Sequence, residues 1–422
     1  MKGRMIVGLD IGSSAIRIVA GQTVPAAEGT TALSIIGAAE TKSEGITKGN
    51  ISSFEDAVSS ISSCLDQAER IIGLPIEDVY VSVGGTQIMV QDAKGIVGVS
   101  RADQTIRRED VVRSIEAART YAQSPNYEII HVLPKTFSLD NQKDIKDPVG
   151  MQGIRLESDV KIIQGLSNHL RNITKAVFRT NVDISELVYA PLAAAEAVVN
   201  KRQKELGVCV VTLGASTTGM AVYEDNELIH AATFLIGSDH ITSDLVYTLR
   251  TSFDIAERIK RAHGHAVPLT FEKQEAINLK DFGHEVNEQI QLPFIAEVIE
   301  ARVEEIFEKI ESELKKIERS GMLPAGVVLT GGGAKLAGIT EVARRIFHLP
   351  ATVSVSHLES SIPELVQDPA FSTAVGLVEW GYEAERQNSQ GIVGFVRPLK
   401  DASGMFSKIT DPVKKIFKSF MP

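Results

Sequence analysis

The pattern of apolar and polar residues divides the chain into two halves that begin alike. In each half, an apolar run, a short turn of small polar residues and a second apolar run follow one another, as in a β-hairpin. The first such stretch is "GLDIGSSAIRIVAG" from Gly8, and the second is "VVTLGASTTGMAVY" from Val210. After each, strand-like runs alternate with helical periodicity. This alternation in two matching halves predicts a duplicated α/β architecture.

The same pattern predicts the individual elements. Apolar residues that recur at helical spacing predict helices over 54–72 (capped by Ser52 or Ser53), 109–122, 168–179, 239–250, 255–263, 293–319 and 372–385, with a further helix from Pro191 and one that ends at Phe347. Short apolar or alternating runs predict strands over 5–11, 15–21, 32–40, 79–83, 161–165, 186–189, 208–213, 228–235 and 326–329. The segment 86–159 is richer in charge, and we interpret it as a small inserted subdomain.

Composition narrows the class of protein. A chain of 422 residues is too long for one compact core, so we expect two domains or one bilobal body. A net charge of −10 argues against general nucleic-acid binding, because no basic surplus offsets the phosphates. Cys64 and Cys209 stand in apolar surroundings and are expected to be buried free thiols in a reducing cytoplasm. Neither a signal peptide nor a membrane-spanning apolar run is present, so we expect a cytosolic protein unless something anchors it.

The turns of the two hairpins carry the candidate chemistry. Glycine and serine in a tight turn present several backbone N–H groups in one direction, and such a concavity holds phosphate oxygens without a lysine. One hairpin of this kind is more often an ordinary surface turn, but two that each open a half of the chain predict a polyphosphate held between two lobes. A third stretch, "VVLTGGGAKLAGI" from Val327, has a buried strand, three glycines and a helix start. Alone it would be a strand–helix connection; beside the hairpins it predicts a loop that faces a nucleoside.

These residues amount to a family resemblance. In chain order, "GLDIGSSAIRIVAG", "VYAPLAAAEAVV", "VVTLGASTTGMAVY", "VVLTGGGAKLAGI" and "STAVGLVEWG" resemble the first phosphate, first connecting, second phosphate, adenosine and second connecting motifs of the actin-like ATPases. Longer stretches, among them "HVLPKTFSLDNQKDIKDPVGMQGIRLESDVKII" and "ITSDLVYTLRTSFDIAERIKRAHG", resemble more narrowly the FtsA family of bacterial cell-division proteins. The resemblance covers about residues 5–420.

The resemblance implies the fold and its division. It implies an α/β, actin-like (ribonuclease H-like) bilobal fold with a duplicated core, a small subdomain inserted in the first lobe and a C-terminal amphipathic helix. The implied segments are 1–83 and 161–190 for the first lobe, 84–160 for the inserted subdomain, 191–370 for the second lobe with its outer subdomain, 371–386 for a return helix, 387–405 for a linker and 406–422 for the terminal helix.

The resemblance also implies an ATP site with Mg²⁺. Asp10 matches the aspartate that orders the water shell of the metal. The matching nucleotide-binding positions are Gly12, Ser13 and Ser14 in the first turn, Gly214, Ala215, Ser216 and Thr217 in the second, Glu257 and Lys260 near the ribose or adenine, and Gly331, Gly332 and Gly333 in the adenosine loop. Many relatives have glycine where Ala215 and Ser216 stand, and their side chains leave less room for a phosphate. Taken alone, Glu257 and Lys260 would be a solvated helix face.

Two positions depart from hydrolysing relatives. The second hairpin has Thr212 where those relatives have an acid that holds metal-bound water, and Ala190 takes the place of a Glu or Gln in the first connecting motif. Both water-activating positions are therefore uncharged. We expect the protein to use ATP mainly to close and polymerise, with slow or absent hydrolysis.

The C-terminal stretch "FSKITDPVKKIFKSFMP" predicts a membrane anchor. Large apolar residues fall on one stripe of a helix and lysines on its other faces, a pattern typical of helices that lie on a membrane surface. The residues concerned are Phe406, Ile409, Val413, Lys414, Lys415, Ile416, Phe417, Lys418 and Phe420. The alternative is a helix docked on the core of the protein itself.

The FtsA resemblance further implies partners and a location. It implies self-association into filaments, contact with other division proteins through the inserted subdomain, and binding of the C-terminal peptide of the tubulin-like protein FtsZ by the outer subdomain. Arg302 in "AEVIEARVEEIF" matches the arginine for that peptide, although by itself it would sooner pair with Glu305. The implied protein is peripheral, on the cytoplasmic face of the membrane at the division site, where it tethers FtsZ filaments and organises the septum.

Two other interpretations of the motifs stay open. One is an actin-fold enzyme, either a chaperone ATPase or a sugar kinase. A chaperone would need a large domain after Glu385, and a kinase a general base, for which no residue beyond Asp10 is a candidate. The other is a pilus-assembly protein of the same superfamily, whose members lack the combination of "DIAERIK" with the tail.

Overall fold

The computed structural model describes residues 4–25, 31–268, 272, 274–285, 287–356, 358 and 362–389. The predicted linker 387–405 falls almost wholly outside the described residues, and the predicted terminal helix 406–422 does so entirely. The chain divides into two compact units, one of Met1–Met89 with Leu166–Glu383 and the other of Val90–Gly165 with Ala384–Pro422.

The first unit opens with a five-stranded sheet, which we call the first lobe. Its strand order is β11-β6-β1-β2-β3, formed by Asp183–Tyr189, Asp78–Val83, Met5–Ile11, Ala15–Pro25 and Thr31–Lys42. β1 pairs antiparallel with β2 and parallel with β6, and β6 pairs parallel with β11. The carboxyl ends of β1, β6 and β11 therefore meet at one edge, the place where open α/β sheets position their ligands.

Helices α1 (Phe54–Ile72) and α3 (Ser167–Phe178) pack on this sheet. α1 is helical because its apolar residues recur at the spacing of one helix face, and Ala57, Ile61 and Leu65 are buried there. It ends at Gly73, which adopts a left-handed conformation at φ +73° and donates its N–H to the carbonyl of Glu69.

The second lobe repeats this arrangement. Its sheet has the order β14-β13-β12-β17-β18, formed by Glu227–Phe234, Thr218–Glu224, Val208–Leu213, Val327–Thr330 and Ala351–Val353. As in the first lobe, the hairpin strands β12 and β13 are antiparallel, and a parallel strand, β17, lies beside β12. Helices α6 (Ser238–Leu249), α8 (Leu292–Lys316) and α9 (Ile339–Phe347) share its apolar core. The prediction of a duplicated core is confirmed.

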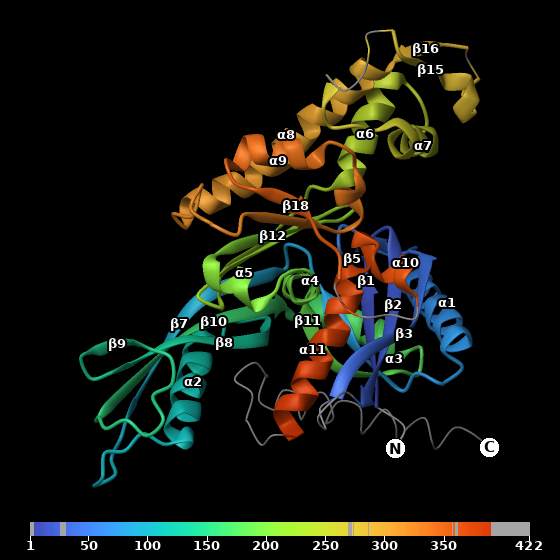
Figure 1. The fold of residues 1–422 in the computed structure, drawn as a ribbon. Helices are drawn as coiled ribbons and strands as arrows, with labels where there is room; N and C mark the ends of the chain where they lie inside the picture. The colour runs from blue at the N-terminus through green and yellow to red at the C-terminus, as the bar shows by residue number, and fades with distance from the viewer. Residues whose placement is uncertain are drawn as a thin grey trace, which may run out of the picture. The chain divides into compact units, whose positions relative to one another are not determined.

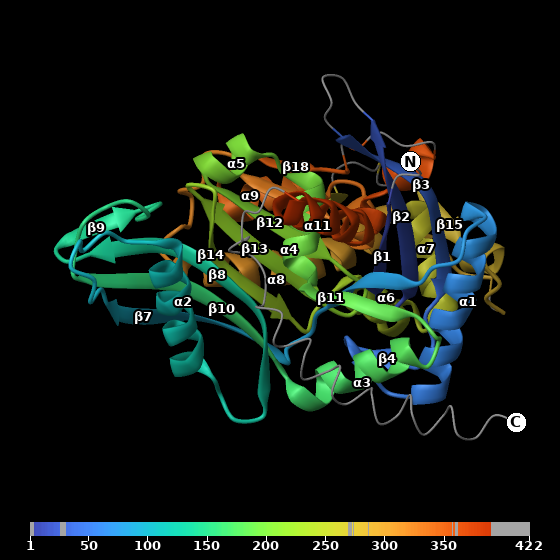
Figure 2. The same ribbon diagram turned by 90° about the horizontal axis from the view of Figure 1, so that it is seen from below.

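Two helices connect the lobes. α4 (Ala190–Val198) follows β11, and α11 (Ser372–Ser389) returns to the first sheet, and both views show them side by side (Figure 1 and Figure 2). The contact is backbone to backbone, because a Cβ atom on Gly376 would lie 1.7 Å from the carbonyl oxygen of Ala193. Any side chain at residue 376 would force these helices apart.

The second unit is a four-stranded sheet with one helix. Its order is β7-β10-β8-β9, formed by Ile88–Gly98, Arg155–Leu166, Tyr127–Leu139 and Gln142–Ile145. α2 (Arg108–Ala122) buries Val111, Ile115 and Ala118 in the core of this unit. The sheet and helix touch closely at Gly95, whose Cβ would lie 1.8 Å from the carbonyl oxygen of Ser114.

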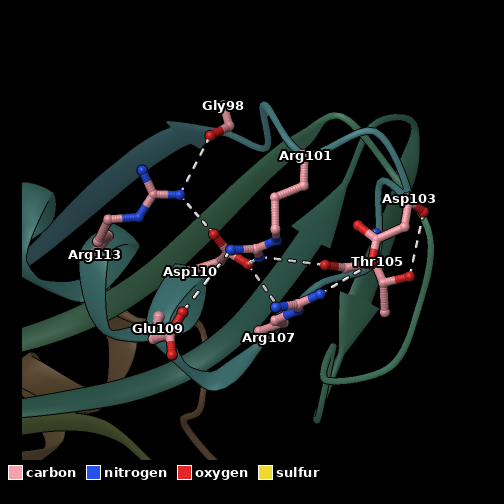
Figure 3. A network of polar contacts seen from close by, with 8 residues as sticks. All are labelled: Gly98, Arg101, Asp103, Thr105, Arg107, Glu109, Asp110 and Arg113. Carbon is pink, nitrogen blue, oxygen red and sulfur yellow. Dashed lines mark hydrogen bonds and ion pairs between the residues drawn. The ribbon is translucent and has the colours of Figure 1, made fainter.

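A buried carboxylate fixes the start of α2 (Figure 3). Asp110 is fully buried and accepts hydrogen bonds from the backbone N–H of Arg107 at 2.9 Å and from the guanidinium of Arg113 at 2.5 Å. Arg101 also donates to it. A buried carboxylate needs several donors to compensate its charge. Removal of one of these partners would therefore destabilise the start of α2.

Most predicted helices and strands are confirmed, with shifted ends. α8 ends at Lys316 rather than at Arg319, the strand expected over 161–165 is the end of β10, and α7 (Phe253–His263) begins two residues before its predicted start. Several elements were not expected from the sequence. In the second unit these are β7, β8 and β9; elsewhere they are β4 (Ile46–Thr47), β5 (Asn50–Ile51), α5 (Lys201–Leu206), β15 (Ala276–Asn278), β16 (Gln289–Gln291), β18 and α10 (Pro363–Val366).

Candidate functional site

The first turn (residues 12–14) joins β1 to β2. The N–H of Gly12 donates to the carbonyl of Ala15 at 3.2 Å, which closes the turn. A Cβ atom on Gly12 would lie 2.7 Å from the same carbonyl oxygen, closer than real Cβ contacts allow. Only glycine therefore fits at residue 12 without a shift of the backbone.

The second turn (residues 214–217) joins β12 to β13 in the same way. The N–H of Gly214 donates to the carbonyl of Thr217 at 2.9 Å, and a Cβ atom on Gly214 would lie 2.7 Å from that oxygen. In both turns a glycine amide bonds the carbonyl three residues on. The two turns therefore share one backbone geometry, as the sequence repeat predicts.

Asp10 is the acid of the first turn. β1 runs parallel to β6 with Leu9 beside Val81, which brings Asp10 beside Ser82. The hydroxyl of Ser82 donates to Asp10 Oδ1 at 2.7 Å and accepts the N–H of Ile11 at 3.1 Å. Burial raises the pKa of the Asp10 carboxyl, while the bond from Ser82 and the charge of Arg17 act in the opposite direction. Such a carboxylate gains from a nearby cation.

Ser82 was not predicted as a site residue. Its sequence signal is a polar residue near the carboxyl end of an otherwise apolar strand, "VYVSV". The register of β1 against β6 gives that residue its role, and single-strand periodicity does not reveal which strands are neighbours.

Thr212 and Ala190 are the residues that the sequence predicts at the two water-activating positions. Thr212 lies on β12 opposite Gly219 and beside Thr330 of β17. Ala190 begins α4 against the end of β6, because a Cβ on Gly84 would lie 3.7 Å from the Cβ of Ala190. Neither position carries charge.

The amino end of α6 lies on the second turn. The N–H groups of Ser238 and Asp239 donate to the carbonyls of Gly214 and Ala215 at 2.9 and 2.8 Å. Ser216, also in the turn, donates its hydroxyl to Asp239 Oδ2 at 3.4 Å. Burial raises the pKa of Asp239, and the charge of Lys260 opposes that shift. No pattern in the sequence indicated that a carboxylate from α6 would lie beside this turn.

Glu257 and Lys260 of α7 belong to a polar network rather than to a solvated helix face. Their side chains are 23% and 10% exposed and pair at 2.6 Å. Lys260 also donates to the hydroxyl of Thr242 at 2.7 Å and to the carbonyl of Ser238 at 3.1 Å. Burial raises the pKa of Glu257, but the ion pair with Lys260 and hydrogen bonds from Lys260, Thr242 and Arg261 outweigh burial, so the pKa lies below its usual value.

The glycines of the predicted adenosine loop pack on the end of β12. Gly331 has φ +85°, and a Cβ there would lie 2.6 Å from the carbonyl oxygen of Leu213. The Cβ of a residue at 333 would lie 3.0 Å from the Cβ of Leu213, whereas Gly332 meets nothing closer than Ala370 at 3.9 Å. The loop therefore adjoins the second turn. At residue 332 a side chain would have room, because a Cβ atom there meets no close contact.

The structure thus brings the predicted residues together in two groups. Asp10, Gly12, Ser13 and Ser14 lie at the edge of the first sheet where β1 and β6 end. The second group is at the matching edge of the second sheet and contains Gly214, Ala215, Ser216, Thr217, Glu257, Lys260, Gly331, Gly332 and Gly333.

Arg302 lies apart from both groups, on α8. Its guanidinium makes a two-pronged ion pair with Asp244 of α6, at 2.6 and 2.8 Å, and a further pair with Glu305. The expected partner Glu305 is thus present, and Asp244 is a second carboxylate that the sequence did not indicate. The hydrogen bonds to Asp244, together with the charges of Asp244 and Glu305, raise the pKa of Arg302, while burial acts in the opposite direction.

The described residues hold neither a membrane span nor a metal cluster. Within the ranges given above, no helix combines the length and the apolar character that crossing a membrane requires. The same residues contain no group of three or more His, Cys, Asp or Glu side chains placed to hold a metal ion. Asp10 remains a single carboxylate, suited to metal-bound water rather than to a complete ligand set.

Comparison with solved structures defines the fold. The fold resembles a PilM–PilN type IV pilus biogenesis complex with a TM-score of 0.61 at 15% identity, over 89% of this chain and 98% of that one. It also resembles MreB5 of Spiroplasma citri bound to ADP, with a TM-score of 0.55 at 11% identity, over 92% of this chain and 98% of that one. The fold is that of the actin-like ATPases, as predicted.

Sequence comparison gives the family. Residues 209–376 match the family "Cell division protein FtsA", and residues 85–164 match "SHS2 domain inserted in FTSA". The cell division protein FtsA of Pseudomonas aeruginosa is 32% identical over 383 residues, 91% of this chain and 90% of that protein. FtsA of Bacillus subtilis is 34% identical over 394 residues, 93% of this chain and 87% of that protein. The chain belongs to the FtsA family of cell-division proteins.

Proposed function

We propose that the protein binds ATP between its two turns, polymerises on the inner leaflet of the cytoplasmic membrane and tethers FtsZ filaments there, so that it organises the division septum. The observation that carries this proposal is the shared geometry of the turns. Each uses a glycine amide bonded to the carbonyl three residues on, with no room for a Cβ atom. Turns of this kind aim backbone N–H groups at phosphate oxygens.

The residues present fit a magnesium nucleotide. Asp10 supplies a carboxylate with a raised pKa beside the first turn, which a cation would stabilise in its charged form. Glu257 and Lys260 are held rigid beside the second turn, as a contact to the ribose or adenine requires. MreB5, a neighbour in fold, has been solved with ADP bound. When bound, Mg²⁺ would neutralise phosphate charge.

We propose that ATP serves assembly more than turnover. Thr212 and Ala190 offer no carboxylate or amide to activate a water molecule. Asp239 is near the second turn, but its hydrogen bond from Ser216 and the charge of Lys260 already engage it. Slow hydrolysis would leave filaments in their ATP-bound state for long periods.

The tail residues 406–422 are proposed to bind the membrane. Partial burial of four large apolar side chains contributes roughly 4–6 kcal/mol, and each lysine adds about 1 kcal/mol on an anionic leaflet. Ordering the helix offsets much of this gain. One tail would bind reversibly, whereas many tails along a filament would bind firmly through avidity.

Partners are proposed for two surfaces. The C-terminal peptide of FtsZ would bind the outer subdomain at Arg302, where an acidic group of the peptide would take the place of Glu305 while Asp244 keeps the guanidinium oriented. Residues 84–160 would contact other division proteins. Both assignments follow the division of the chain implied by the family.

Co-sedimentation with anionic vesicles tests the proposal. We expect the full chain to pellet with vesicles, more so with Mg-ATP, and to carry FtsZ into the pellet. Phe417→Glu should abolish pelleting, whereas Ser419→Glu, which adds the same charge on the opposite side of the helix, should weaken it much less. Equal pelleting of the two variants would refute the anchor, and calorimetry without any adenine nucleotide binding would refute the site.

A further inference from the structure

A small hairpin that the sequence did not predict lies on the first turn. β4 and β5 pair at residues 46–51, and the two residues between them, Lys48 and Gly49, have φ +53° and +77°. Two consecutive left-handed residues are typical of the tight turn that joins short antiparallel strands. The base of the hairpin is fixed, because the carbonyl of Gly45 accepts the N–H groups of Ser52 and Ser53 at 2.8 and 3.1 Å.

The tip of this hairpin bonds directly to the proposed phosphate turn. The N–H of Gly49 donates to Ser13 Oγ at 3.1 Å. Nearby, the N–H of Ser43 donates to the carbonyl of Ser14 at 3.1 Å. On its other side the tip packs on Gly85, since a Cβ on Gly49 would lie 3.4 Å from the Cα of Gly85. The tip is therefore held between the first turn and the end of β6.

The bond from Gly49 has a consequence for Ser13. A serine hydroxyl has one proton and two acceptor lone pairs. Because Ser13 Oγ accepts from Gly49, its own proton is free to point toward another acceptor, such as a phosphate oxygen in front of the turn.

Lys48 is placed to add charge at the same point. Its Cα is two covalent bonds from the amide nitrogen that contacts Ser13 Oγ, so the Cα lies within about 5.5 Å of that oxygen. The neighbouring cations are engaged, Arg17 with Glu40 at 2.6 Å and Lys42 with Glu44 at 3.4 Å. Lys48 is exposed, and within the described ranges it has no ion pair. A lysine stem is long and flexible enough to bring the ammonium to a phosphate bound at the turn.

We propose that Lys48 binds the polyphosphate of the nucleotide and that the turn of Lys48 and Gly49 is a third wall of the phosphate site. This inference rests on the proposed function. A nucleoside triphosphate carries several negative charges, and the backbone amides of the two turns carry no net charge. Lys48 would supply positive charge that the turns lack, so the proposed contact is to phosphate.

Calorimetry with Mg-ATP on the full chain tests the role of Lys48. We expect Lys48→Gln to weaken binding at least tenfold and to flatten the loss of affinity between 50 and 300 mM KCl, because one charge pair is removed. Lys48→Arg should stay within about threefold of the unchanged protein. Lys42→Gln is the matched control, and it should bind as the unchanged protein does.

The outcomes separate the two proposals. An unchanged protein that binds Mg-ATP while Lys48→Gln binds it within twofold would overturn the role of Lys48 alone. An unchanged protein with no affinity for Mg-ATP would overturn the proposed function itself. Binding of adenosine, which lacks phosphates, should be the same for Lys48→Gln and the unchanged protein; a tenfold loss there as well would show a general disturbance of the site and would also overturn the phosphate contact.

Discussion

The first and second turns have the same backbone geometry but different neighbours. At the first turn, Asp10 lies near the carboxyl end of β1, and the hydroxyl of Ser82 on the adjacent strand donates a hydrogen bond to it. At the second turn, Thr212 takes the equivalent place, and the carboxylate beside the turn, Asp239, comes from α6. The duplicated fold thus repeats its backbone and places its acids independently in each half.

Because of this difference, the two lobes suit different parts of a nucleotide. The first turn combines one partly buried carboxylate with the exposed Lys48, which suits the charged end of a nucleotide. The second turn is surrounded by groups that satisfy one another, with Lys260 paired to Glu257 and bonded to Thr242. A site whose charges are already paired suits a neutral sugar or base. Single substitutions at each turn test this contrast.

The largest effect is expected at Asp10. Asp10→Asn removes the acid at the first turn that could order a magnesium water shell, yet its amide oxygen can still accept the Ser82 hydroxyl. We expect affinity for Mg-ATP to fall about 100-fold, or about 2.7 kcal/mol. Affinity for ATP in EDTA should change little. Isothermal titration calorimetry with and without Mg²⁺ measures both.

The second turn provides the control for that substitution. Thr212→Val, at the equivalent strand position, should leave Mg-ATP affinity within about threefold. Since burial raises the pKa of Asp10, the Asn variant should melt no earlier than the unchanged protein without nucleotide. Equal losses from both substitutions would mean that the two turns are not specialised.

The next effect concerns the backbone that the two turns share. Gly12→Ala and Gly214→Ala each place a Cβ 2.7 Å from a carbonyl oxygen. Each should lower the free energy of unfolding by about 2 kcal/mol, because the turn must open to relieve the overlap. Denaturant unfolding measures the change. A stable alanine variant at one turn only would show that the geometry is not shared.

Gly73→Ala tests whether these losses are particular to the turns. No atom lies within 4 Å of a Cβ placed on Gly73, although its φ of +73° is unfavourable to alanine. Its cost should therefore come from backbone conformation alone, about 1 kcal/mol. A larger loss at Gly73 than at the turns would contradict the explanation by overlap.

The repeated parts of this fold could be predicted from the sequence more readily than the contacts between them. The hairpins and their glycines are local patterns, and two copies support each other. Ser82, Asp239 and Lys48 were missed because strand register or helix docking brings each to the site from a distant segment. No property of "GSDH" or "ITKGNI" alone places a side chain beside a turn far away in the chain.

The strands of the second unit were missed for another reason. β7, "IMVQDAKGIVG", and much of β8 alternate apolar with charged or polar residues, and the charge density indicated an inserted subdomain without defining its strands. Cross-strand ion pairs make this pattern stable, such as Lys161 with Asp92 at 2.6 Å and Lys94 with Asp159 at 2.9 Å. Single-strand patterns do not show which charges will be neighbours.

A third prediction restores the missing acid. Thr212→Asp would place a carboxylate on β12 at the position equivalent to Asp10, where the family resemblance predicts an acid in hydrolysing relatives. We expect phosphate release from Mg-ATP to rise about tenfold, equivalent to about 1.4 kcal/mol of the activation barrier. A steady-state phosphate assay measures this rise. The double variant with Asp10→Asn should lose the gain, since the substitution acts through bound metal; a gain that persists would contradict that account.

The last effect is expected at the connecting helices and depends on pH, because a glutamate stands at the same distance from the contact in each helix but has different partners. Glu196 of α4 and Glu379 of α11 each stand three residues after the point where the helices touch, at Ala193 and Gly376. Glu196 pairs with Lys204 at 2.7 Å. One carboxyl oxygen of Glu379 is buried without a hydrogen-bond partner among the described residues.

The pKa of Glu379 accordingly rises to about 8, first because of burial and then because of the charges of Glu196 and Glu383, with Lys204 acting in the opposite direction. In the unfolded chain the same group loses its proton near pH 4.5. The stabilisation from the protonated form is therefore complete below pH 4.5 and is lost as the pH rises to about 8, above which it no longer changes. Each pH unit of such a shift corresponds to about 1.4 kcal/mol, so we expect a loss of several kcal/mol, reduced by the partial exposure of the side chain to solvent.

Glu379→Gln should remove this pH dependence, since an uncharged amide keeps the shape of the protonated acid. The difference in unfolding free energy between Glu379→Gln and the unchanged protein should move steadily in favour of Gln as the pH rises from 5 to 8, and should level off above pH 8. Glu196→Gln tests the neighbouring charge in the other helix. Because the charge of Glu196 contributes to the raised pKa of Glu379, this substitution should weaken the pH dependence without removing it. A difference between Glu379→Gln and the unchanged protein that stays constant from pH 5 to 8.5 would mean that Glu379 is ionised at neutral pH, and would contradict the prediction.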